Sequence, residues 1–112
     1  MLLLVYCAVY RVGVEGAWSE AFAFRTQPAS EQWTPRVAVF GDMGLTNARA
    51  LEFLLADPFA DRIDSVLHIG EVAYDLADEN STVGDAFMNL IESFVTQVPY
   101  MFAVGNHESS KE

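Results

Sequence analysis

Three short apolar runs in the chain each end in a glycine that is followed by a polar residue. Residues 37–40 precede Gly41-Asp42, residues 66–69 precede Gly70-Glu71, and residues 101–104 precede Gly105-Asn106. Valine, isoleucine and phenylalanine in runs of this length indicate buried β-strands. We expect Gly41 to provide a sharp exit from the first strand, because a residue without a Cβ accepts backbone angles that others avoid.

Between these runs, apolar residues recur every three or four positions, as they do on one face of a helix. The first such face comprises Ala48, Leu51, Leu54 and Leu55, with Thr46 as the expected N-cap and Pro58 as the stop. The second comprises Val83, Phe87, Leu90, Ile91, Phe94, Val95 and Val98, and Pro99 ends it. The order β-α-β-α-β predicts an α/β fold with parallel strands and right-handed crossovers.

The polar residues after the strands are the candidates for chemistry. Parallel strands bring Asp42, Glu71 and Asn106 to one edge of the sheet, where α/β proteins bind their ligands. With His107, they offer the carboxylate, amide and imidazole groups that hard cations and borderline transition metals bind. Each residue alone has an ordinary explanation, such as a turn or a surface position. Their three equivalent positions favour a metal site.

Two other interpretations are less favourable. A dinucleotide-binding fold requires Gly-x-Gly-x-x-Gly, whereas residues 41–44 lack that spacing and place an acid where the pyrophosphate would lie. His68 lies inside the second strand, so its side chain is expected on a face of the sheet. We therefore predict that His68 is a packed or hydrogen-bonded core residue and not a metal ligand.

The N-terminal part has a different pattern. Residues 3–12 alternate as a strand does, residues 13–16 form the expected turn, and residues 18–25 form the returning strand. Prolines then mark a linker, which gives predicted units at 1–27 and 36–112 joined by 28–35. Residues 1–9 are too short to span a bilayer. They lack the positive start and a convincing cleavage site of a signal peptide, so we favour part of a strand from a truncated domain and keep a signal peptide as the weaker alternative.

Composition narrows the function. Sixteen acids against six bases give a net charge of −10, which argues against binding nucleic acid. An acidic chain that binds a phosphate ester needs a local positive charge, and a metal ion would supply it. Cys7 is the only cysteine, which excludes an internal disulfide, and its apolar neighbours indicate a small buried side chain.

The blocks Gly41-Asp42-Met43-Gly44, Gly70-Glu71-Val72-Ala73-Tyr74 and Gly105-Asn106-His107-Glu108 resemble the first three sequence blocks of the calcineurin-like metallophosphoesterases. A tyrosine three residues after the acid of the second block is similar to the purple acid phosphatases. The surrounding sequence, Val-Leu-His-Ile-Gly above all, resembles the animal-type iron/zinc enzymes. The upstream hairpin resembles the last strands of that family's fibronectin-III-like domain. The resemblance extends over about residues 10–110.

The resemblance implies a role for each residue. Asp42 and Tyr74 would bind a ferric ion (Fe3+), with Tyr74 as tyrosinate, and Glu71 would bridge two metals. Asn106 would bind the second metal, which is zinc, Fe2+ or Mn2+, and would also contact substrate. His107 would be catalytic, binding the phosphate and protonating the leaving group. The implied function is hydrolysis of phosphate monoesters by an acid phosphatase, secreted or lysosomal by family expectation and with no membrane span.

Two departures from the family qualify this expectation. The family carries Asp where this chain has Glu71, and the family's later blocks supply histidine ligands that this sequence, with two histidines in all, does not contain. We therefore expect an N-terminal fragment that is inactive alone. The alternative is a non-catalytic truncated relative that serves as a binding or structural piece. A metallophosphoesterase of another subclass is disfavoured by Tyr74 and by the hairpin.

Overall fold

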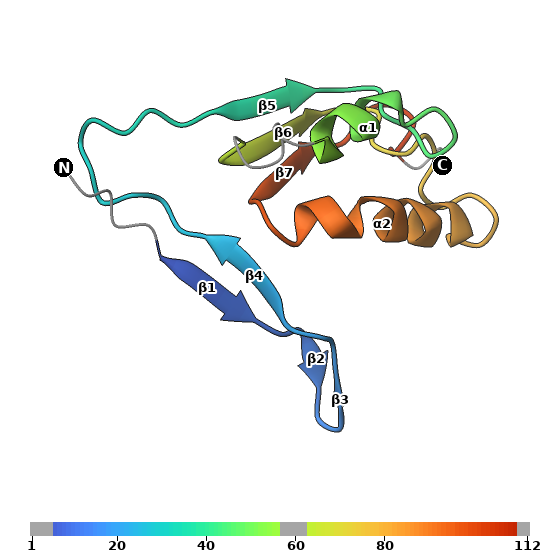
Figure 1. The fold of residues 1–112 in the computed structure, drawn as a ribbon. Coiled ribbons are helices and arrows are strands. Elements are labelled where there is room, and N and C mark those ends of the chain that lie inside the picture. Colours follow the sequence, from blue (N-terminus) through green and yellow to red (C-terminus); the bar gives the residue numbers. More distant parts are fainter. Residues whose placement is uncertain (1–5, 57–62, 110–112) are drawn as a thin grey trace.

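The computed structural model describes residues 6–56 and 63–109. It contains a β-hairpin followed by a three-stranded sheet with two helices (Figure 1). The Cα radius of gyration is 16.0 Å, whereas a compact domain of about 100 residues has roughly 13 Å. The hairpin accounts for this difference, because it extends away from the α/β part (Figure 1).

The sheet comprises β5 (Val37–Phe40), β6 (Ser65–Ile69) and β7 (Tyr100–Ala103), in that spatial order. Both pairs are parallel, and Phe40, His68 and Phe102 lie side by side in the register. This confirms the predicted α/β order and the parallel sheet. The loops that follow the three strands therefore lie at the same edge of the sheet.

Helices α1 (Arg49–Leu55) and α2 (Thr82–Val95) contact each other and pack on the same face of the sheet. The core between them and the sheet comprises Met43, Leu51, Leu54, Ile63, Val66, Val72, Ala73, Phe87, Ile91 and Phe94. The predicted apolar face of α2 is confirmed at Phe87, Ile91 and Phe94. Leu90, which was expected on that face, is 37% exposed because it lies at its margin.

The predicted start of α1 is wrong. Helix α1 begins at Arg49, after Ala48, and has no side-chain cap, whereas Thr46 is exposed and lies outside the helix. The residues before the helix belong to the loop that follows β5, in which the Gly44 N–H donates to the Val72 carbonyl at 3.1 Å. Pro58, the expected stop, lies outside the described residues.

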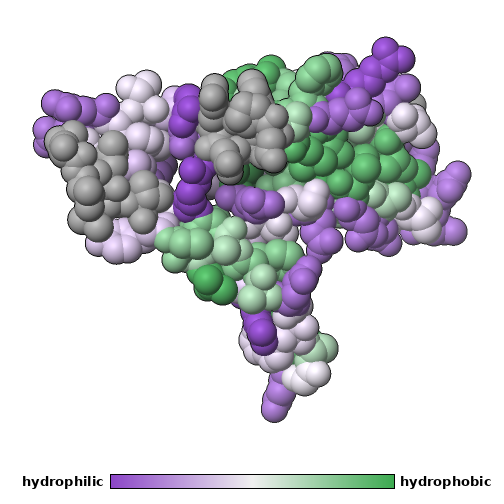
Figure 2. Space-filling view, in the orientation of Figure 1, coloured by the Kyte–Doolittle hydropathy of each residue, from purple (hydrophilic) through white to green (hydrophobic). Residues whose placement is uncertain are grey.

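The opposite face of the sheet carries apolar side chains without a covering layer. Val37, Val39, Ile69 and Met101 are 42%, 57%, 62% and 55% exposed. Right-handed crossovers in one direction place both helices on the other side, so nothing among the described residues covers this face. Figure 2, in which α1 lies in front of the sheet, shows hydrophobic residues at the surface in the region of the helices and also on the hairpin.

The strands of the hairpin pair closer to its tip than the sequence predicted, and residues 3–5 of the predicted first strand lie outside the described residues. Strands β1 (Cys7–Tyr10) and β4 (Phe22–Arg25) pair antiparallel, and the pairing resumes in β2 (Gly13–Val14) and β3 (Ala17–Trp18). The turn is therefore at 15–16, not over the whole of 13–16. Cys7 is exposed, contrary to expectation, because the two-stranded ribbon has no second layer over it.

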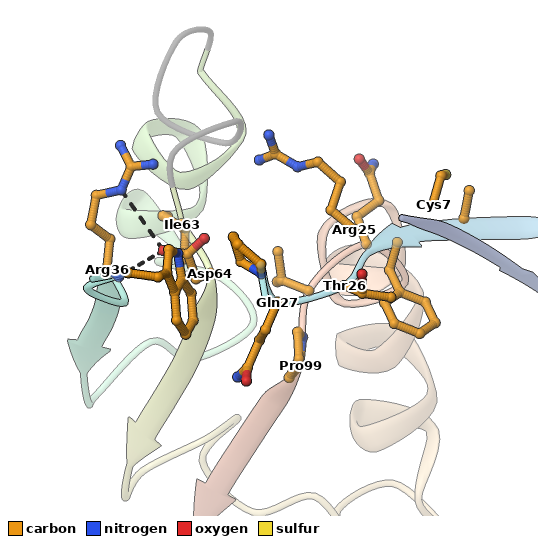
Figure 3. A pocket seen from close by; sticks show the side chains of 14 residues that line it. Cys7, Arg25, Thr26, Gln27, Arg36, Ile63, Asp64 and Pro99 are labelled. Atoms are coloured by element: carbon orange, nitrogen blue, oxygen red, sulfur yellow. Dashed lines mark hydrogen bonds and ion pairs between the residues drawn. The ribbon is translucent and has the colours of Figure 1, made fainter. Parts of the chain in front are cut away.

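In the described residues, a hydrogen bond and a shared pocket lie between the hairpin and the α/β part. The Tyr10 hydroxyl donates to the Thr96 carbonyl at 2.9 Å, just beyond α2. A pocket between β4, the linker and the start of β6 contains Thr26, Gln27 and Asp64, and the Arg36 N–H donates to the Asp64 carboxylate at 2.7 Å (Figure 3). This pocket is at the amino ends of the strands, opposite the predicted metal edge. Within the described residues, no helix is long and apolar enough to cross a membrane.

Candidate metal centre

The loop after β5 approaches the next strand closely. A Cβ on Gly41 would lie 2.9 Å from the Ile69 carbonyl oxygen, so only glycine fits there without a shift. Gly41 was expected to have the unusual backbone angles, but Asp42 has them, with φ of 55°. The Asp42 N–H donates to the Gly70 carbonyl at 3.2 Å, which fixes the aspartate at the sheet edge.

Three of the predicted ligands have left-handed backbone conformations. Asp42, Glu71 and Tyr74 have φ of 55°, 48° and 56°. Such angles are uncommon outside glycine and carry a strain of about 1–3 kcal/mol each. Asp75 and residues 79–81 also have positive φ, so the conformation is common in the segment between β6 and α2 and does not by itself mark the site.

Asp42 and Tyr74 are brought together from different loops. The Tyr74 hydroxyl donates to Asp42 Oδ1 at 2.9 Å. This hydrogen bond to the Asp42 carboxylate, with burial and nearby carboxylates, raises the pKa of Tyr74 above its ordinary value. A cation bound between the two oxygens would replace the shared proton.

Glu71 reaches across to the third loop. Its Oε1 accepts the Asn106 N–H at 3.0 Å, while Oε2 is buried with no hydrogen-bond partner among the described residues. A Cβ at Gly105 would collide with the Glu71 carboxylate and backbone nitrogen, so this approach depends on the glycine. A buried carboxylate oxygen without a partner is unfavourable unless a cation satisfies it. The free, buried oxygen of Glu71 is therefore suited to binding a metal ion.

His107 lies beside Tyr74, with ring centroids 5.1 Å apart. Its Nδ1 is 3.4 Å from Asp75 Oδ2, which is a long contact. Asp75 was not among the residues predicted for the site. The available signal was its position next to Tyr74, in the loop that the parallel sheet brings towards His107.

Glu108 was also missed as a participant. Its carboxylate accepts the N–H groups of Ala73, Tyr74 and Gly105. Burial tends to raise the pKa of Glu108, but backbone N–H groups, that of Gly105 foremost, outweigh it and hold the pKa below its ordinary value. The signal in the sequence was an acid directly after the Asn106-His107 pair.

His68 is a core residue, as predicted. It is 0% exposed, and its Nδ1 lies 2.6 Å from the Tyr100 hydroxyl. Burial lowers the pKa of His68 and raises the pKa of Tyr100 to about 12. The pair is packed between the sheet and α2, where Phe87 lies against the His68 ring.

The five predicted site residues therefore share one edge. Hydrogen bonds link Asp42 with Tyr74 and Glu71 with Asn106, and His107 packs on Tyr74. In the part of the chain that the structure describes, no three His, Cys, Asp or Glu side chains are close enough to hold a metal ion. Any metal here would depend on the phenol of Tyr74 and the amide of Asn106 in addition to the carboxylates.

The residues of this edge lie in a part of the chain that is similar to known proteins. A family model described as calcineurin-like phosphoesterase matches residues 35–112, which contain the whole sheet and all five residues. The chain belongs to the calcineurin-like phosphoesterases.

Within that family, the chain is similar to purple acid phosphatases. Acid phosphatase type 7 from Homo sapiens is 46% identical over 100 residues, which is 89% of this chain and 23% of that protein. The protein named probable inactive purple acid phosphatase 1 from Arabidopsis thaliana is 32% identical over 119 residues, which cover 88% of this chain and 19% of that protein.

A solved structure supports the same assignment. The purple acid phosphatase from yellow lupin (Lupinus luteus) seeds matches with a TM-score of 0.61 and 30% identity, over 96% of this chain and 21% of that chain. This calcineurin-like phosphoesterase chain thus spans about a fifth of the length of the proteins it matches.

Proposed function

We propose that this chain contributes the first half of a dinuclear metal site that hydrolyses phosphate monoesters. The observation that carries the proposal is the convergence of Asp42, Tyr74, Glu71 and Asn106 at the carboxyl ends of three parallel strands. The similarity to acid phosphatase type 7 supports the reaction class, and the family model supports the fold that holds the site.

The residues divide between two positions. Asp42 and Tyr74 would hold a ferric ion, Asn106 would hold zinc, Fe2+ or Mn2+, and Glu71 would lie between them. When bound, the two ions would offset charge on the phosphate and lower the pKa of an attacking water. The buried, unpaired Oε2 of Glu71 is the atom whose environment most requires such a charge.

The chain's own groups have defined tasks in this proposal. The Tyr74 phenol must release the proton that it now donates to Asp42, so metal binding is coupled to proton release. His107, held beside Tyr74 and Asp75, would donate a hydrogen bond or a proton to the phosphate ester oxygen. The Asn106 amide would contact the substrate from the third loop.

The domain organisation is part of the same proposal. Residues 1–27 would be the last strands of a fibronectin-III-like domain, 28–35 the linker, and 36–112 the start of the phosphoesterase domain. The match to the lupin enzyme covers 96% of this chain, which extends beyond the family model's residues 35–112 and so supports the hairpin's inclusion. Secretion or a lysosomal location is proposed on family grounds alone.

A non-catalytic binding or structural role is the second candidate. It is favoured by Glu71, whose longer side chain reaches the Asn106 N–H in place of a short bridging aspartate. The similarity to a plant relative named as probably inactive points in the same direction.

One experiment distinguishes the two. The chain is expressed, loaded with Fe3+ and Zn2+, and examined for visible tyrosinate absorption and for release of p-nitrophenol from its phosphate ester. Colour and turnover, both lost in Tyr74→Phe and Asn106→Ala, support the enzyme. Colour without turnover supports the binding role, and the absence of both contradicts a metal site on this edge.

A further inference from the structure

Glu108 lies at the junction of the second and third loops of the site. Its Oε1 accepts the N–H groups of Ala73 and Tyr74 at 3.1 and 3.1 Å, and its Oε2 accepts the Gly105 N–H at 2.9 Å. The two oxygens of one carboxylate therefore bind different loops. A charged acceptor makes such hydrogen bonds about twice as strong as neutral ones.

The three loops are held to one another by different kinds of contact. The first and second loops are joined by backbone hydrogen bonds, from Asp42 N–H to the Gly70 carbonyl and from Gly44 N–H to the Val72 carbonyl. Beyond the last β6–β7 backbone bond, from Gly70 N–H to the Ala103 carbonyl, the second and third loops are joined through side chains. Among the described residues, Glu71 accepts the Asn106 N–H, His107 packs on Tyr74 and makes a long 3.4 Å contact with Asp75, and Glu108 accepts N–H groups from both loops.

Glu108 fixes the backbone of residues whose side chains face the site. Tyr74 has a left-handed φ of 56°, and the bond from its N–H to Glu108 offsets part of that strain. Gly105 directly precedes Asn106, so its N–H fixes where the third loop leaves β7. A shift of this tie would change the distance between the Tyr74 phenol and the Asn106 amide.

We propose that Glu108 is a positioning residue that sets the spacing of the Tyr74 and Asn106 loops and thereby the affinity of the site for metal. Only the effect on metal affinity rests on the proposed function, because the hydrogen bonds of Glu108 to both loops are present in the metal-free chain. Both oxygens of Glu108 already accept backbone N–H groups, so we assign it a positioning role and not that of a metal ligand.

The test uses Glu108→Ala and Glu108→Gln in the full chain, with Glu79→Ala, at an exposed acid between β6 and α2, as the control. Amide hydrogen exchange is measured without metal, and Fe3+ affinity is followed by tyrosinate absorption. Loss of the carboxylate should accelerate exchange at Ala73, Tyr74 and Gly105 at least tenfold and weaken Fe3+ binding about 10–100-fold. Gln, which keeps one acceptor oxygen, should lie between the parent chain and Ala.

Each result decides the proposal. Unchanged exchange at the three amides in both variants would overturn it, as would equal acceleration at the Val66 amide within the sheet, which would mean general loss of stability. Faster loop exchange with Fe3+ affinity within twofold of the parent would also overturn it. If the parent chain binds no Fe3+, the proposed function fails, while the exchange rates still decide whether Glu108 ties the loops.

Discussion

At the scale of single residues, the candidate site is defined by which polar atoms have partners. Among the described residues, the Tyr74 hydroxyl donates to Asp42, Glu108 accepts three backbone N–H groups, and Glu71 keeps one buried oxygen without a partner. Glu71 is thus the residue at which the metal-free site is least satisfied. Its extra methylene allows the contact with Asn106 and places the carboxylate differently from the aspartate of the family pattern.

Glu71→Asp should tighten metal binding. The shorter side chain frees the Asn106 N–H and returns the carboxylate towards the position that a bridging aspartate occupies, so we expect affinity for Fe3+ and Zn2+ to rise about tenfold. Isothermal titration of the purified chain measures this. Glu92→Asp, an exposed change on α2, is the matched control, and equal or weaker binding in Glu71→Asp would show that the longer side chain suits this site.

Tyr100→Phe should destabilise the fold by about 1–3 kcal/mol, because it leaves His68 Nδ1 buried without its partner. Urea denaturation measures the free energy of unfolding. Tyr6→Phe, at an exposed tyrosine in the hairpin, should change it little. A Tyr100→Phe variant as stable as the parent would mean that the His68–Tyr100 hydrogen bond contributes no net stability.

The same residue predicts an alkaline dependence. The folded-state pKa of Tyr100 is raised to about 12 from an ordinary value of 10.0, so the folded state disfavours the phenolate. The contribution of Tyr100 to stability is therefore complete below pH 10 and is lost as pH rises towards 12. Urea midpoints from pH 9 to 12 should fall more steeply in the parent chain than in Tyr100→Phe, and parallel curves would contradict this assignment.

At the scale of elements, α2 holds the sheet by a narrow apolar stripe. Phe87, Ile91 and Phe94 are buried, whereas Met88 beside Phe87 is 57% exposed. Helical spacing alone identified the stripe, because side chains three and four positions apart share a face. Helix α1 was located less accurately, since its start depends on the loop that carries Asp42 and not on a cap within its own sequence.

Phe87→Ala should cost about 3–5 kcal/mol of stability, because it removes a fully buried ring and leaves a cavity against His68. Met88→Ala, the next residue on the exposed side, should cost far less. Both are measured by urea denaturation of the same preparation. Similar losses in the two variants would show that α2 is rotated relative to this arrangement.

At the scale of the whole molecule, the dominant feature is the apolar face of the sheet opposite the helices. Val39 and Ile69 are 57% and 62% exposed there, and contiguous apolar surface of this kind promotes association. The hairpin does not cover it, because its described contacts are to the region after α2 and to the amino ends of the strands.

The 112-residue chain should therefore bind a hydrophobic dye such as ANS strongly in its folded state. Replacing Val39 and Ile69 together by threonine should reduce the fluorescence by more than half. The matched control replaces Val12 and Val14 of the hairpin by threonine. These valines are 64% and 71% exposed but lie away from the sheet. A folded monomer that leaves the dye dark would contradict an open sheet face.

The sequence by itself determined the strands, the apolar face of α2, the burial of His68 and the set of residues that meet at the sheet edge. These follow from local periodicity and from the parallel order, which brings Asp42, Glu71 and Asn106 together whatever the details of the loops. The predicted face of the first helix is correct at Leu51 and Leu54 but wrong at Leu55, which is 42% exposed at the end of α1.

Only the tertiary structure decided how those residues contact one another. It set the left-handed conformations of Asp42, Glu71 and Tyr74. It also formed the hydrogen bonds from Asn106 to Glu71 and from Tyr74 to Glu108, which join positions more than 30 residues apart. Such contacts depend on strand register and on the close approach that glycine permits at 41 and 105. No periodic pattern encodes them, because they arise from the distances between loops after the sheet has formed.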